Sequence, residues 1–367
     1  MRSRRALMTA AMVALAATGF ARCRAPEPPA VSSSSSVEEE TAALDLCTGP
    51  AREGLEGKIA FASDRTGNYE IFVVNADCRG LTQLTHSPSA DYHPAWSPDG
   101  TRIAFASSDG GDDIFVMNAD GSGRTRLTDE PGDDHEVSWS PDGTRIAFTS
   151  NRTGTYEIFV MKADGTGVTR VTDTPTDDRE PAWSPDGTRI AFSGGGTGGH
   201  GFGPGTGNYD IFVINADGTG VNRLTSDPED DQNPAWSPDG TKIAWKRDRT
   251  GANRLLVMNA DGSGVVQLAR DAGGGGETTR GYRDWSPDGS PAWSPDGTRI
   301  GFSSKRAGNT EILVVNANGS GMTKLTDHPA NDDEPAWQPW PPRRPATPPP
   351  LPATSPVPAA TTLPATT

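Results

Sequence analysis

After its first twenty residues, the sequence has no long apolar run with helical periodicity, and it is poor in apolar residues. Hydrophobic residues make up 33% of the 367 residues, whereas glycine and proline number 43 and 32. This composition argues against a helical bundle, because glycine and proline are unfavourable inside helices. It is typical of many short strands joined by tight turns.

Common enzyme signatures are also missing. The sequence has no Gly-x-Ser-x-Gly nucleophile motif, no His-Glu-x-x-His zinc motif and only five histidines. We therefore expect a binding protein rather than an enzyme. One enzymatic alternative stays open: His93 and His135, with Asp91 and Asp134, would hold a divalent metal for a lyase or hydrolase reaction.

The charge is strongly of one sign, with a formal net charge of −15 at pH 7. Such a chain repels phosphate backbones, so we expect no nucleic-acid partner. The charge suits a cation, a basic protein surface or solubility alone.

The two ends of the sequence differ from its middle. Residues 1–23 combine Arg2, Arg4 and Arg5 with a short apolar stretch from Ala6 to Phe20, the pattern of an export signal. The apolar stretch is too short to predict a membrane span, so we expect no transmembrane helix in the mature chain. Residues 24–57 are interpreted as a flexible spacer, and residues 340–367, rich in Pro, Ala and Thr, as a disordered tail.

Three cysteines are present, all near the N-terminus. In an oxidising compartment Cys47 and Cys78 are expected to form a disulfide between the N-terminal arm and the first repeat. Cys23 lies where a lipoprotein cysteine would lie, so a lipid anchor there is an alternative way of attachment.

An internal repeat is the strongest signal in the sequence. Six tryptophans mark it, separated by 43 or 44 residues except across two glycine-rich insertions. They are Trp96, Trp139, Trp183, Trp236, Trp293 and Trp337. A period of this length is typical of the four-stranded blades of a β-propeller.

One repeat illustrates the four strands. Residues 180–183 form a short first strand, and Ser-Pro-Asp-Gly at 184–187 has the chemistry of a tight turn. Residues 189–192, 211–214 and 222–225 supply the other three strands. We predict an all-β, six-bladed propeller of antiparallel blades over residues 58–339. The first repeat lacks its tryptophan strand and the last has only that strand, so pairing of 334–337 with the N-terminal blade would close the ring.

These motifs resemble the repeats of the TolB propeller family, whose namesake is the periplasmic component of the Tol–Pal system. The resemblance rests on Pro-Ala-Trp-Ser-Pro-Asp-Gly-Thr-Arg-Ile-Ala-Phe and on Ile-Phe-Val-Met-Asn-Ala-Asp-Gly, and it covers residues 58–337. Similar repeats occur in the propellers of prolyl oligopeptidase-like enzymes. The resemblance implies an exported, monomeric, non-enzymatic scaffold that binds a protein partner in the cell envelope. It would be periplasmic, envelope-associated or extracellular. A surface-display module anchored by its proline-rich tail is the remaining alternative.

Acidic residues precede each tryptophan strand and give the clearest candidate site. Because first strands line the axis of a propeller, we expect a ring of carboxylates at one mouth of the central channel. Its members would be Asp91, Asp134, Asp178, Asp231 and Asp332. The ring would bind Ca²⁺ or a basic peptide, unless these aspartates simply cap the links. Arg65, Arg152 and Arg249, in neighbouring loops, are predicted to bridge to the acidic links.

Overall fold

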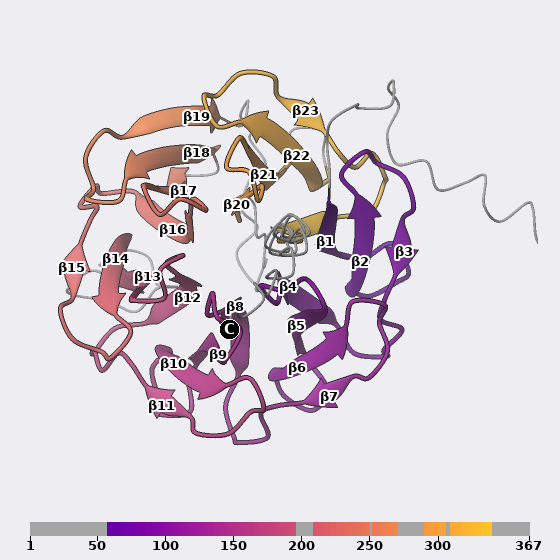
Figure 1. The fold of residues 1–367 in the computed structure, drawn as a ribbon, viewed down its shortest axis with the longest axis horizontal. Coiled ribbons are helices and arrows are strands. Elements are labelled where there is room, and N and C mark those ends of the chain that lie inside the picture. Colours follow the sequence, from indigo (N-terminus) through magenta and orange to yellow (C-terminus); the bar gives the residue numbers. More distant parts are fainter. Residues whose placement is uncertain (1–56, 196–207, 250–251, 271–289, 306–308, 340–367) are drawn as a thin grey trace, which may run out of the picture. The chain divides into compact units, whose positions relative to one another are not determined.

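The computed structural model describes residues 57–195, 208–249, 252–270, 290–305 and 309–339. These residues form six antiparallel sheets of four strands each, arranged as blades around a central axis (Figure 1). The predicted all-β, six-bladed architecture is confirmed. Within the described ranges, no helix is long and apolar enough to cross a membrane.

Blades 1 to 3 take the first part of the chain and its last strand. Blade 1 contains β24 (Asp332–Trp337), β1 (Lys58–Ser63), β2 (Glu70–Asn75) and β3 (Thr82–Gln83). Blade 2 contains β4 (Asp91–Trp96), β5 (Arg102–Ser107), β6 (Asp113–Asn118) and β7 (Thr125–Arg126). Blade 3 contains β8 (Asp134–Trp139), β9 (Arg145–Ser150), β10 (Glu157–Lys162) and β11 (Thr169–Arg170).

Blades 4 to 6 follow in chain order. Blade 4 contains β12 (Asp178–Trp183), β13 (Arg189–Gly195), β14 (Tyr209–Asn215) and β15 (Asn222–Arg223). Blade 5 contains β16 (Asp230–Trp236), β17 (Lys242–Arg249), β18 (Ala252–Asn259) and β19 (Val266–Arg270). Blade 6 contains β20 (Ala292–Trp293), β21 (Arg299–Ser304), β22 (Glu311–Asn316) and β23 (Thr323–Lys324). In each blade the first-named strand is the innermost (Figure 1).

The two ends of the propeller sequence meet in blade 1. Strand β24 pairs antiparallel with β1, with Trp337 opposite Ile59 and Ala336 opposite Ala60. This pairing gives β1 a hydrogen-bonded neighbour on its inner side. Neither strand is left with two open edges.

The apolar core lies between blades rather than inside one blade. The cluster between blades 6 and 1 joins Phe61 and Phe72 with Ile312, Leu325 and Trp337, all of them buried. Burial of each large apolar side chain is worth about 1.5–3 kcal/mol. A single four-stranded sheet has two apolar faces, so each blade needs a neighbour on both sides.

The Ser-Pro-Asp-Gly turns fold as their sequence predicts. In blade 3, Ser140 Oγ donates to Asp142 Oδ1 at 2.6 Å, and the amide of Gly143 donates to the Ser140 carbonyl oxygen at 2.9 Å. Gly143 has φ of 70°, which favours glycine. Hydrogen bonds from Ser140 and Thr144 lower the pKa of Asp142 to about 2. These turns are therefore explained by local turn chemistry.

Candidate functional site

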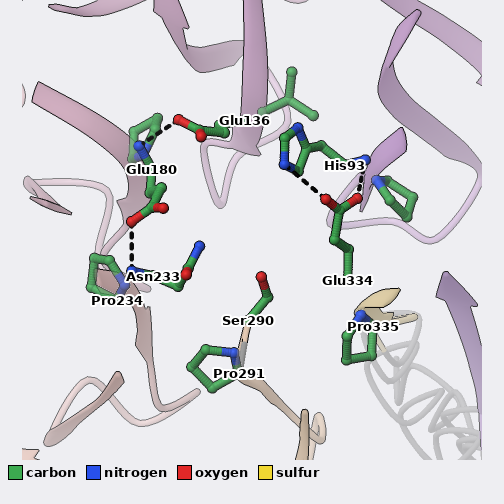
Figure 2. Close-up of a pocket in the computed structure, with 12 residues that line it drawn as sticks. His93, Glu136, Glu180, Asn233, Pro234, Ser290, Pro291, Glu334 and Pro335 are labelled. Carbon is green, nitrogen blue, oxygen red and sulfur yellow. Dashed lines mark hydrogen bonds and ion pairs between the residues drawn. The ribbon is translucent and has the colours of Figure 1, made fainter. Parts of the chain in front are cut away.

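Six equivalent residues, each three positions before a blade's tryptophan, line a pocket in the central channel (Figure 2). We call them the channel ring: His93, Glu136, Glu180, Asn233, Ser290 and Glu334. The residue after each of them completes the lining, a proline in five blades and Val137 in blade 3. The cavity volume is about 160 Å³.

A backbone irregularity turns these side chains toward the axis. The pairing of the innermost strand with its neighbour shifts register at this position in blades 1 to 5. The five ring members of those blades have φ between 53° and 58°, in the left-handed region. Such a conformation costs a non-glycine residue about 1–3 kcal/mol. In a regular strand, side chains point to the two sheet faces, which here face neighbouring blades. The bulged residues instead face the channel.

Carboxylates of the ring bind the bulged backbone of the next blade. Glu136 Oε2 accepts a hydrogen bond from the amide of Glu180 at 2.9 Å, and Glu180 Oε2 accepts one from the amide of Asn233 at 2.6 Å. Glu334 Oε2 accepts from the amide of His93 at 2.5 Å. These charge-assisted bonds offset the backbone strain and hold the ring members in place. They also give the ring a structural role.

An ion pair adds to the ring at the junction of blades 1 and 2. His93 Nε2 lies 2.9 Å from Glu334 Oε1 (Figure 2). Burial lowers the pKa of His93, but Glu334 outweighs burial and raises it to about 9. His93 is therefore protonated at neutral pH.

The two other ring glutamates have opposite pKa shifts. Burial tends to raise the pKa of Glu136, but His135, Arg179 and His93 together hold it well below its usual range. Burial and the charge of Glu136 raise the pKa of Glu180. The ring thus offers a firmly ionised carboxylate beside one that titrates more easily, which suits a pocket for a cationic or hydrogen-bonding group.

The five predicted aspartates lie close to the ring but not in it. All are buried, with at most 2% of the residue exposed. Four of them bind arginines, with closest N–O distances of 2.6–3.2 Å. The pairs are Asp332–Arg65, Asp91–Arg124, Asp134–Arg152 and Asp231–Arg247. The predicted bridges from Arg65 and Arg152 are thus present, whereas the side chain of Arg249 lies outside those described. Binding of Ca²⁺ or a peptide by the aspartates stays a prediction.

The two predicted histidines are neighbours. The ring centroids of His93 and His135 are 5.9 Å apart, and His135 is fully buried, with Nδ1 3.4 Å from Glu136 Oε2. Among the described residues, no group of three or more His, Cys, Asp or Glu side chains is arranged to hold a metal ion. The metal-dependent alternative stays a prediction.

Sequence reasoning missed Glu136, Glu180 and Glu334. It followed the acidic residue that recurs two positions earlier, because that residue repeats in every blade. For Glu180 and Glu334 the following proline was the available signal, whereas Glu136 is followed by Val137. Proline lacks an N–H and so favours a break in strand pairing.

Other predictions fall on the N-terminal and C-terminal segments. Cys78 is disulfide-bonded, and the other two cysteines, Cys23 and Cys47, lie outside the described residues. The export signal, the spacer and the proline-rich tail also lie outside them. These assignments stay predictions.

Comparison with known proteins shows that part of this chain is similar to one protein family. A family model described as the TolB beta propeller domain matches residues 94–203. The Tol-Pal system protein TolB of Anaeromyxobacter dehalogenans (strain 2CP-C) is 37% identical over 133 residues, which cover 36% of this chain and 27% of the relative. The chain thus spans about a quarter of the length of that relative. Dipeptidyl-peptidase 5 of Porphyromonas gingivalis is 52% identical over only 42 residues, 11% of this chain and 6% of the enzyme.

Solved structures share the fold. TolB from Acinetobacter baumannii matches with a TM-score of 0.64 and 23% identity, over 77% of this chain and 67% of that one. A chain of the nidogen/laminin complex matches with a TM-score of 0.58 and 14% identity, over 77% of this chain and 98% of that one. Matches this distant in sequence show a common propeller architecture.

Proposed function

Because this chain carries a TolB-type β-propeller, we propose that it is an exported, non-enzymatic scaffold that binds a protein partner of the cell envelope through the channel pocket. The observation that carries the proposal is the channel ring itself. Five of the six blades adopt a strained backbone at the same position, and this places polar side chains around one cavity. Strained backbone of this kind is most often found at functional sites, where the surrounding structure holds it in place.

The chemistry of the pocket indicates what such a partner would present. Glu136, Glu180 and Glu334 place three carboxylates around the cavity, and His93 supplies one positive charge. Asn233 and Ser290 add neutral hydrogen-bonding groups. A side chain or chain terminus with several N–H donors fits this lining better than an acidic group. A basic segment of an envelope protein is therefore the proposed ligand.

Photo-crosslinking from the ring tests the proposal. Ser290 is the position to replace with a photo-reactive residue in the full chain expressed in its host, because no inter-blade hydrogen bond from its side chain is described. We expect one protein to crosslink repeatedly, and we expect Glu180→Gln to reduce its yield. The matched control places the photo-reactive residue at Asp217, in an exposed turn after β14. Equal crosslinking from Ser290 and Asp217 would argue against a channel partner.

A further inference from the structure

A buried lysine lies next to the channel ring. Lys246 of β17 is only 6% exposed. Among the described residues, no hydrogen bond or ion pair involves its ammonium group. Lysine is almost never this buried unless it is paired, because burial of an uncompensated charge is costly. The place of Lys246 in its blade shows what could compensate it.

Lys246 occupies a position at which three other blades have a hydroxyl group. It pairs with Gln232, the residue before the ring member of blade 5. Thr149 and Ser193 pair in the same way with the residues before the ring members of blades 3 and 4. Blade 6 has Ser303 at this position, and blades 1 and 2 have alanine. The charged side chain is therefore specific to blade 5.

The hydroxyl groups at this position contact the ring. Thr149 Oγ1 donates to Glu136 Oε2 at 2.8 Å, and Ser193 Oγ donates to Glu180 Oε2 at 2.6 Å. The same two oxygens accept hydrogen bonds from the amides of the ring members in the next blades, at 3.1 Å and 3.2 Å. A side chain at this position thus reaches the ring members of its own blade and of the next one.

In blade 5 the two ring members concerned are Asn233 and Ser290, which both line the channel pocket (Figure 2). They are the two uncharged members of the ring. Burial and the charge of Glu136 raise the pKa of Glu180, and the positive charge of Lys246 opposes this rise, so its charge is felt within the ring. The pocket therefore has carboxylates in blades 1, 3 and 4 and an ammonium group beside neutral hydrogen-bonding side chains in blades 5 and 6.

We propose that Lys246, Asn233 and Ser290 form a subsite for a carboxylate, and that the ligand of the channel is a C-terminal arginine or lysine of the partner. This inference rests on the proposed function and adds the second charge of the ligand. The basic side chain meets the ring glutamates, and the α-carboxylate meets the ammonium group. A ligand with positive charge alone would leave Lys246 uncompensated. Because the cavity measures only about 160 Å³, a single residue that carries both charges fits it best.

A pair of peptides that differ in one charge tests the subsite. They are acetyl-Gly-Arg with a free C-terminal carboxylate and acetyl-Gly-Arg-amide, each titrated into the full chain and followed by two-dimensional NMR. We expect the free acid to bind at least tenfold more tightly than the amide, because only the free acid can pair with Lys246.

Variants at one position assign this preference to Lys246. Lys246→Ser introduces the residue that blades 4 and 6 have here, so the fold should tolerate it, and it should reduce the preference to less than about twofold. Lys246→Met keeps a long apolar stem without the charge and gives the same test if the serine variant does not fold. The matched control is Lys242→Ser, at the exposed start of the same strand, which should leave the preference unchanged.

Glu180→Gln separates this inference from the proposed function. It should weaken both peptides alike, because it removes a carboxylate that meets the basic side chain. Equal affinity of the two peptides for the unchanged chain would overturn the carboxylate subsite and leave a channel site for a basic group in place. A preference that persists in both Lys246 variants would have the same meaning. Failure of both peptides to bind at millimolar concentration would overturn the subsite together with the basic ligand of the proposed function.

Discussion

The buried ring of aspartates and the channel ring lie two positions apart on the innermost strands, and they have different surroundings. The aspartates at the start of these strands are buried between blades, and four of them bind an arginine. The glutamates of the channel ring lie on bulged backbone and face a cavity. A repeated acidic residue is therefore not by itself a binding site. The local backbone decides whether the carboxylate meets an arginine of its own chain or an open space.

The largest expected effect is a loss of folding stability when an aspartate of the buried ring is replaced. Asp134→Asn removes the counter-charge of the Arg152 guanidinium, and loss of one partner of a buried pair is strongly destabilising. We expect a loss of about 3 kcal/mol in the free energy of unfolding, measured by urea denaturation. Asp173→Asn, at an exposed carboxylate, should change it by less than about 0.5 kcal/mol. A loss at Asp134 no larger than at Asp173 would contradict the structural role of this ring.

Asp178 sharpens the comparison, because it belongs to the buried ring but pairs with no arginine among the described residues. Burial, followed by the charge of Glu157, raises the pKa of Asp178 from 3.8 to about 7. A carboxyl group that binds its proton more tightly in the folded state stabilises the fold most below about pH 4 and loses this contribution as the pH rises through about 7.

The variant Asp178→Asn should remove this part of the pH dependence. The slope to be lost is at most about 1.4 kcal/mol per pH unit. Urea denaturation at several pH values between 4 and 7 measures the slope for both proteins. An identical slope in the variant would show that Asp178 does not titrate in this range.

A smaller effect is expected from the channel ring. Because the folded-state pKa of His93 is raised from 6.5 to about 9, its pairing with Glu334 stabilises the fold fully below about pH 6.5 and no longer does so above about pH 9. His93→Gln should lower the free energy of unfolding at pH 6, and should lower it less at pH 9.5. Thermal melting at the two pH values checks this. Equal losses at both would mean that the charge of His93 contributes nothing.

The sequence predicts the fold well and the site only partly. The six tryptophans and the Ser-Pro-Asp-Gly turns repeat at fixed spacing, so strand number and blade number follow from local chemistry. The bridges from Arg65 and Arg152 were predictable because both arginines occupy the same place in their repeats.

The rest of the site depends on backbone conformation and on contacts between residues far apart in the sequence. Alternation along a regular strand cannot show that Glu180 has φ of 58° and faces the channel. Nor can it show that Arg124, from another part of its blade, takes the place of the absent loop arginine. Both follow from tertiary packing, which a repeat pattern alone does not specify.

The most direct test of the central claim is the affinity of the crosslinked partner for three forms of the protein. These are the unchanged chain, Glu180→Gln in the channel ring and Asp217→Asn in an exposed turn, each measured by isothermal titration at two salt concentrations. The account predicts at least tenfold weaker binding for Glu180→Gln, about 1.4 kcal/mol, and no change for Asp217→Asn. Equal affinity of all three forms would contradict a partner site in the channel.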